Sequence, residues 1–179
     1  MRKVAFPILF FLFLISNLHA ESQFERMMNG QDSTNYDSVK VEEVLSADTI
    51  MLAGGEKIKL IGLNAPSIPK RERIVRDENN IPIKEPINPT DTIEQKSYRF
   101  VERLLTGKTV RLEFDEQKKS DDFKTLAYIF LKDGTFVNVE ILRQGYAQFQ
   151  LQPLNHKYKK ELEAAYQEAS REQRGFMSR

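Results

Sequence analysis

The side chains of this chain that could do chemistry are few, and the most useful of them lie next to turns. Asp48 supplies carboxylate oxygens, the ligands that a hard cation such as Ca²⁺ requires. It stands in the sequence SADT, residues 46–49, which also suits a simple turn between two strands. Lys59 alternates with apolar neighbours, and Lys124 follows a polar stretch. Each lysine could therefore contact an anion or belong to an ordinary solvated surface.

A second group of charged side chains lies in a loop. Lys70, Arg71 and Arg73 form a basic cluster, which favours either a solvated loop or a substrate-binding contact with phosphate or anionic lipid. His156 has no His, Cys or carboxylate at metal-ligand spacing, so we interpret it as a surface or capping residue. The sequence contains no Gly-rich phosphate loop, zinc-ligand spacing or Ser/His/Asp nucleophile pattern.

The elements that must position these residues begin with an alternating meander. Residues 38–46 alternate with one slip at Val44, 49–52 form a second strand, and 57–63 form a third after a Gly-containing turn. Gly62 predicts a bend where the sheet curls.

A long proline-rich loop follows over residues 66–92, of the kind that is usually a functional lid or an insertion. The sequence from Asp91 to Glu94 predicts a helix start with Glu94 in a capping box, and Gly107 predicts the end of that helix.

The second half of the chain adds two strands and two helices. Strands are predicted over 109–115 and 126–131, a short helix capped by Asn138, an extended piece over 146–151 and a last helix over about 157–174. This order indicates an α+β fold. A five-stranded OB-type barrel with about three helices is one arrangement among several that the pattern allows.

The first residues predict export. Arg2 and Lys3 precede an apolar run that is too short for a membrane span, which is typical of a signal peptide over 1–20. An uncleaved anchor stays the alternative. Residues 21–37 are polar and predict a tether, and 38–177 form the domain. We therefore expect a periplasmic or secreted protein with no transmembrane helix in its mature part. Because the sequence has no Cys, its core must hold it without disulfides.

The charge balance argues mildly against tight nucleic-acid binding. The chain has 27 Lys and Arg against 26 Asp and Glu, and removing Arg2 and Lys3 leaves 25 against 26. Domains that grip phosphate backbones are normally basic.

Six short motifs occur in a fixed order from about Val39 to Met177. They are SADT (46–49) with KIKLIGLNAPS (57–67), GKTVRLEFD (107–115), KTLAY (124–128), DGTFVN (133–138), LRQGYA (142–147) and the closing amphipathic helix. With these motifs the chain resembles the staphylococcal thermonuclease family. The resemblance implies the OB-type barrel and a Ca²⁺-dependent phosphodiesterase that cuts DNA and RNA.

The resemblance also assigns roles to residues, and most of those roles fall on changed side chains. Asp48 occupies the place of one metal-binding carboxylate, whereas Asn64 replaces the second. Ser67 stands at the catalytic glutamate, and Lys59 and Lys124 stand at the two phosphate-clamping arginines. Lysine keeps the charge but loses the planar, two-pronged grip. Any Ca²⁺ site would be weak or absent.

Two further departures from the family pattern concern the substrate cleft. Asp121 and Asp122 bring negative charge close to the expected phosphate, and residues 148–152 lack the expected tyrosines.

Three functions remain open at this stage. The leading hypothesis is a catalytically degenerate domain that binds nucleic acid, nucleotide or protein. The alternative is an active metal-dependent secreted nuclease with a rearranged site, in which an acid such as Glu72 from the long loop replaces the lost base. The third is a structural envelope protein.

Overall fold

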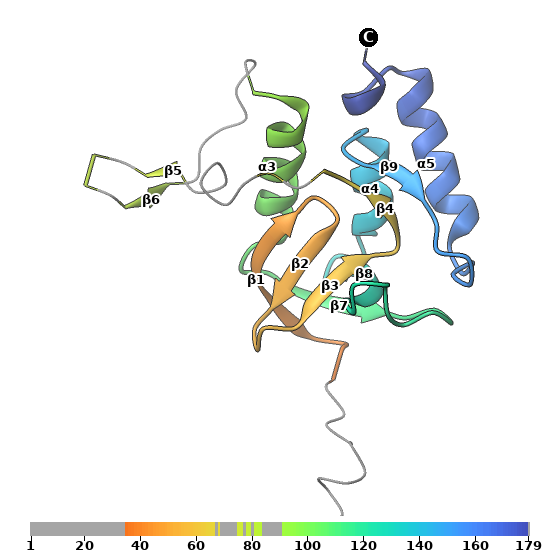
Figure 1. The fold of residues 1–179 in the computed structure, drawn as a ribbon, viewed down its shortest axis with the longest axis horizontal. Coiled ribbons are helices and arrows are strands. Elements are labelled where there is room, and N and C mark those ends of the chain that lie inside the picture. Colours follow the sequence, from red (N-terminus) through yellow and green to blue (C-terminus); the bar gives the residue numbers. More distant parts are fainter. Residues whose placement is uncertain are drawn as a thin grey trace, which may run out of the picture. The chain divides into compact units, whose positions relative to one another are not determined.

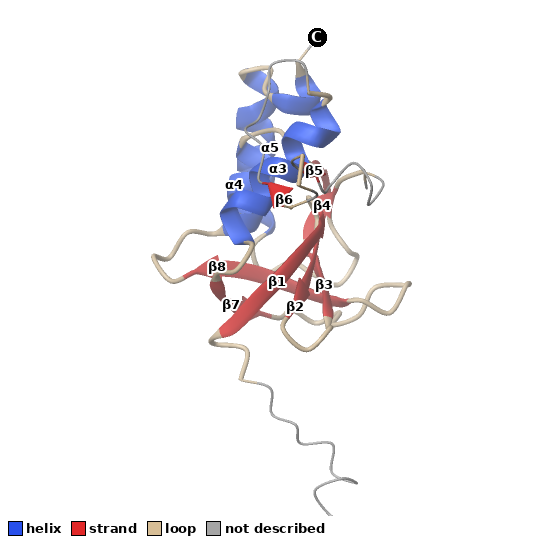
Figure 2. Ribbon diagram, turned by 90° about the vertical axis from the view of Figure 1, so that its left-hand side faces the viewer, coloured by secondary structure: helices blue, strands red, loops and turns tan. Residues whose placement is uncertain are grey.

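Five strands close into a barrel, which confirms the α+β, OB-type prediction. The computed structural model describes residues 35–66, 68, 75–76, 78–79, 81–83 and 91–178. In barrel order the strands run β1-β2-β3-β8-β7. Their bounds are β1 (Val39–Ser46), β2 (Thr49–Leu52), β3 (Lys57–Leu60), β7 (Thr109–Glu113) and β8 (Thr125–Leu131). The helices gather at one end of this barrel (Figures 1 and 2).

The barrel closes through one parallel contact. All neighbouring strands pair antiparallel except β3 and β8, where Lys59 lies beside Leu126. The pairing of β1 with β2 shifts register between Val41 and Glu43 and again between Val44 and Ser46. The slip predicted at Val44 is therefore a real irregularity, and bulges of this kind bend a strand as barrel closure requires.

The predicted third strand is divided in two. After β3, Gly62 takes a φ of 84°, and β4 (Gly62–Asn64) leaves the barrel to pair with β9 (Gln148–Gln150). A Cβ on Gly62 would lie 2.7 Å from Cδ1 of the buried Leu162. Glycine is thus required here both for its backbone angle and for the close helix packing.

Three α-helices and a short 3₁₀ helix complete the domain. They are α3 (Ile93–Leu105), α4 (Val137–Arg143), α5 (Lys159–Arg171) and η1 (Gly175–Met177). The capping box of α3 differs by one residue from the prediction, because Thr92 and Gln95 form it and Glu94 lies in the first turn. The last helix is shorter than predicted and buries Leu162, Ala165 and Ala169.

Asn138 does not cap its helix, contrary to the prediction. The side chain is fully buried: its Oδ1 accepts from the Ile129 amide at 2.9 Å, and its Nδ2 donates to the Ile61 carbonyl at 2.9 Å. It therefore joins α4 to β8 and to the junction between β3 and β4, where two backbone groups would otherwise lack partners.

The core lies between the barrel interior and the helices. Every residue of β8 is buried, as expected for a strand covered on both faces. The largest fully buried side chains are Tyr128, Ile50, Ile58, Leu60, Ile61, Leu63, Leu105, Leu126, Ile129, Ile141, Leu142 and Leu162.

The loop predicted over residues 66–92 contains a short two-stranded sheet. Strands β5 (Val75–Arg76) and β6 (Pro82–Ile83) pair antiparallel there. Ser67, the basic cluster at 70–73, the predicted signal peptide and most of the predicted tether lie outside the described residues. In the part of the chain that the structure describes, no helix combines the length and apolarity needed to cross a membrane.

Candidate functional site

The carboxylate of Asp48 is buried and surrounded by donors. It follows β1 in the tight turn to β2, and the residue is only 3% exposed. Its Oδ1 accepts from Ser46 Oγ at 2.6 Å and from Thr49 Oγ1 at 2.9 Å. Its Oδ2 accepts from Lys59 Nζ at 2.7 Å and from the Ala65 amide at 3.1 Å. The turn, β3 and the end of β4 thus converge on one side chain.

This arrangement satisfies Asp48 without a metal ion. A carboxylate offers about four acceptor positions, and four donors occupy them. The ammonium group of Lys59 supplies the positive charge that a cation would bring. Among the described residues, no three His, Cys, Asp or Glu side chains lie close enough to hold a metal ion together. Within the described part of the chain, Asp48 is therefore a single carboxylate with its acceptor positions filled, whereas Ca²⁺ binds six to eight oxygens.

Asn64, the residue at the place of the second carboxylate, is exposed at the end of β4. It adds a neutral amide oxygen next to Ala65 but no charge. The geometry at Ser67 is outside the described residues.

Lys124 is also engaged by a carboxylate. Its Nζ lies 2.5 Å from Asp122 Oδ2 in the turn between β7 and β8, and Ser120 Oγ donates to Asp122 Oδ1 at 2.6 Å. The hydrogen bond from Lys124, reinforced by the one from Ser120, lowers the pKa of Asp122 to about 2. Both lysines at the predicted phosphate-clamping positions are thus paired with acidic side chains of the chain itself.

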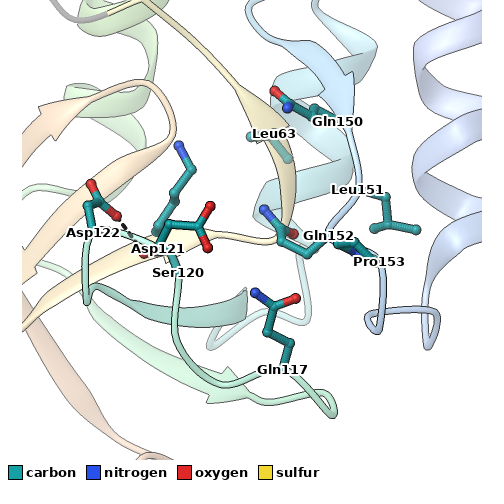
Figure 3. Close-up of a pocket in the computed structure, with 10 residues that line it drawn as sticks. Leu63, Gln117, Ser120, Asp121, Asp122, Gln150, Leu151, Gln152 and Pro153 are labelled. Carbon is teal, nitrogen blue, oxygen red and sulfur yellow. Dashed lines mark hydrogen bonds between the residues drawn. The ribbon is translucent and has the colours of Figure 1, made fainter.

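A pocket of about 530 Å³ opens beside Lys59. Its walls come from β3 and β4, from the turn between β7 and β8, and from the segment after β9. Figure 3 shows Asp121 on one side facing Gln117 and Gln152, with Asp122 turned toward Ser120. The lining residues are Lys59, Leu63, Gln117, Ser120, Asp121, Asp122, Gln150, Leu151, Gln152 and Pro153.

The two walls of this pocket are tied together below it. The Gln117 amide donates to Asn155 Oδ1 at 2.9 Å, and Asn155 Nδ2 donates to the Gln117 carbonyl at 3.2 Å. Asn155 is fully buried. This reciprocal pair holds the segment after β9 against the turn after β7.

A charged cluster forms a second connection between the end of β7 and the segment before α5. Burial opposes the charge of Glu113, but hydrogen bonds from Arg111, Lys157 and Tyr158 outweigh it and lower the pKa of Glu113 to about 2. Lys157 Nζ lies 2.5 Å and Tyr158 Oη 2.8 Å from Glu113 Oε2. Because Glu113 ends β7 while Tyr158 precedes α5, the cluster fixes the last helix on the barrel.

The structure shows where the described site residues of the sequence analysis lie, and their roles stay predictions. It brings Asp48 and Lys59 into direct contact, places Lys59 in the pocket wall and pairs Lys124 with Asp122, which lines the pocket. The three pocket glutamines were not predicted as site residues. Their signal was faint: the polar residues 148–152 stood out only for the tyrosines they lack.

Comparison with known proteins identifies the class. The family described as staphylococcal nuclease homologue matches residues 57–179, more than half of the chain. The chain therefore belongs to the staphylococcal nuclease family.

Two relatives support this assignment along most of the chain. A thermonuclease from Staphylococcus intermedius is 30% identical over 146 residues, which cover 80% of this chain and 77% of that protein. A thermonuclease from Staphylococcus hyicus is 28% identical over 152 residues, covering 83% and 80% of the two chains.

Proposed function

We propose that this protein is an exported, non-hydrolytic member of the staphylococcal nuclease family that binds a ligand in the pocket beside Lys59. The observation that carries the proposal is the internal ion pair of Asp48 with Lys59. In this contact Asp48, at the metal-binding position, and Lys59, at one phosphate-clamping position, bind each other, so neither charge is left for a metal ion or a phosphate.

The losses expected in rate are large. Removing one electrostatic donor at a developing charge typically costs about 10²–10³ in rate, and losing general base assistance costs about 10²–10⁴. Here the base position holds Ser67, and Lys59 and Lys124 are each held by an acid. Even without full additivity, these changes together bring family-type hydrolysis close to background.

The role of Ca²⁺ follows from the same contacts. The resemblance to thermonucleases implies this cation, but one carboxylate already bonded to four donors would bind it more weakly than millimolar protein sites do, with a Kd of about 30 mM or more. Ca²⁺ is therefore dispensable for the binding function that we propose.

Export is the part of the proposal that rests on sequence. The basic and apolar start supports a signal peptide over 1–20 and a tether over 21–37, with the binding domain over 38–177. The site of action would then be the periplasm or the exterior of the cell.

The rival function is a metal-dependent nuclease with a rearranged site. It is favoured by the two relatives named thermonuclease and by the retention of Asp48. In that case an acid from the long loop, such as Glu72, would have to serve as the base.

Hydrolysis assays separate the two. The purified protein is incubated with single- and double-stranded DNA and RNA in Ca²⁺, Mg²⁺, Mn²⁺ or EDTA, beside Asp48→Asn and, as a matched exposed control, Asp37→Asn. We expect no cleavage above that of Asp48→Asn in any metal. Metal-dependent cleavage that Asp48→Asn abolishes and Asp37→Asn retains would refute the proposal.

A further inference from the structure

From the pocket's lining we infer that it binds an arginine side chain presented by a short extended segment of a partner protein. This inference rests on the proposed function, because it names the ligand of the same pocket. It is carried by the charge left available in the pocket and by two exposed apolar residues that directly follow lining residues in the sequence.

The charge available in the pocket is negative. Lys59, the only cation among the described lining residues, is paired with Asp48, and Asp122 is paired with Lys124. The exposed carboxylate of Asp121 forms no ion pair or hydrogen bond with any other described residue. As Figure 3 shows, it faces the pocket interior. A cationic ligand in the pocket could form an ion pair with this carboxylate.

The amide groups in the pocket suit a ligand with several donors. Gln117 Nε2 donates to the Lys119 carbonyl at 3.1 Å, which leaves Gln117 Oε1 as an acceptor. Gln150 forms no side-chain hydrogen bond with the other described residues, so its amide is also available. A guanidinium group carries five donors in a plane, and a carboxylate with amide oxygens around it can accept them. Leu151 and Pro153 offer an apolar wall for the methylene stem.

Two exposed apolar residues adjoin the pocket lining in sequence. Phe123, which is 87% exposed, directly follows Asp122, and Leu154, which is 55% exposed, directly follows Pro153. Phe123 also holds a φ of 61°, a conformation that a bulky residue adopts only at a cost in stability. A strained and exposed aromatic residue one position after the pocket lining suits a binding role, here against the apolar neighbours of the arginine or its guanidinium face.

Nucleic acid fits the same surface poorly. Each nucleotide would bring a phosphate charge toward Asp121, whereas the two lysines at the phosphate-clamping positions are engaged by Asp48 and Asp122. Protein is therefore the class of partner that the described residues favour.

The test uses fluorescence anisotropy with a fluorescein-labelled peptide of sequence GALRLAG and the full mature protein. The matched peptide carries citrulline in place of arginine, which keeps the shape and removes the charge. We expect citrulline to weaken binding by about tenfold, and Asp121→Asn to weaken the arginine peptide by about five- to tenfold. Asp37→Asn, an exposed aspartate outside the pocket lining, should leave the affinity unchanged.

Phe123→Gly gives a second readout that a purely structural role would not produce. It should weaken the peptide by about two- to fivefold while raising Tm by about 2 °C, because the strained backbone is relieved. Equal binding of both peptides, no binding at millimolar peptide, or insensitivity to Asp121→Asn would overturn the inference. Binding of a labelled 12-nucleotide DNA that Asp121→Asn strengthens, with no peptide binding, would also overturn it. Metal-dependent hydrolysis in the assays above would refute the proposed function instead. If the protein shows no hydrolysis and binds no peptide, this inference alone is refuted.

Discussion

Replacing Lys59 by methionine should destabilise the fold, because it leaves a buried charge without its partner. Asp48 would retain the hydroxyls of Ser46 and Thr49 and the Ala65 amide, but no positive charge. Methionine keeps an unbranched apolar stem of four heavy atoms and lacks only the terminal ammonium group, so the change isolates that group.

The expected size follows from the burial of the two partners. Breaking a fully buried ion pair costs about 3–5 kcal/mol. The Asp48 side chain is 4% exposed, but that of Lys59 is 22% exposed, so water screens part of the loss. We therefore expect Lys59→Met to lower the free energy of unfolding by about 2–3 kcal/mol. This corresponds to a fall in Tm of about 5–10 °C for a domain of this size.

Urea unfolding at pH 7 measures this change, and the same strand offers a matched control. Lys57 is exposed two residues earlier in β3, so Lys57→Met should change stability by less than about 0.5 kcal/mol. A double-mutant cycle with Asp48→Asn should give a coupling energy of about 1.5–3 kcal/mol between the two positions. Equal effects of Lys59→Met and Lys57→Met, with no coupling to Asp48, would refute the reasoning.

Three further changes test contacts that join separate elements of the domain. Because the pKa of Glu113 is about 2 in the folded state, below its ordinary value of 4.5, its charge stabilises the fold above pH 4.5, and that contribution is lost between pH 4.5 and 2. Glu113→Gln should therefore cost about 1–2 kcal/mol at pH 7, allowing for solvent screening, and little at pH 2. Gly145→Ala should cost about 3 kcal/mol or more, because its Cβ would lie 2.3 Å from the Arg174 carbonyl oxygen. Asn138→Ala should cost about 3 kcal/mol, because it leaves the Ile129 amide and the Ile61 carbonyl buried without partners.

Each of these changes has a control or an outcome that contradicts it. For Glu113→Gln, chemical unfolding across pH should show the difference from the native protein shrinking as pH falls, and a constant difference would contradict the assignment. Gly134→Ala serves as the control for Gly145→Ala, since its φ is 87° but its Cβ would meet nothing within 4 Å. If both substitutions lower the free energy of unfolding equally, backbone strain rather than the contact with Arg174 accounts for the loss. For Asn138→Ala, a fall in the free energy of unfolding of less than about 1 kcal/mol would show that its hydrogen bonds to Ile129 and Ile61 contribute little to stability.

The sequence predicted the barrel well because its signals are local. Alternation located the five strands, and Gly62 marked the bend that the structure has. The helix start near residue 92 was predicted to within one residue, since Glu94 and Gln95 are equally consistent with a capping box on sequence grounds. Asn138 was misplaced as a cap because its actual partners, at Ile129 and Ile61, are set by tertiary packing.

The candidate site was only partly predictable, for a similar reason. The resemblance indicated Asp48, Lys59 and Lys124 as site residues, but not that Lys59 would bond Asp48 eleven residues away, or that Asp122 would hold Lys124. The pocket glutamines come from two segments that the buried Asn155 joins, and no local pattern reveals such a contact.

We propose that an internal lysine takes the place of the cation at Asp48, and Ca²⁺-dependent thermal unfolding measures whether it does. A site with a Kd of 0.1 mM would stabilise the fold by about 2.7 kcal/mol at 10 mM Ca²⁺, or about 5–10 °C in Tm. We predict a shift below about 1 °C relative to 10 mM Mg²⁺, the same in the native protein and in Asp48→Asn. A rise of 5 °C or more that is specific to Ca²⁺ and lost in Asp48→Asn would contradict the claim.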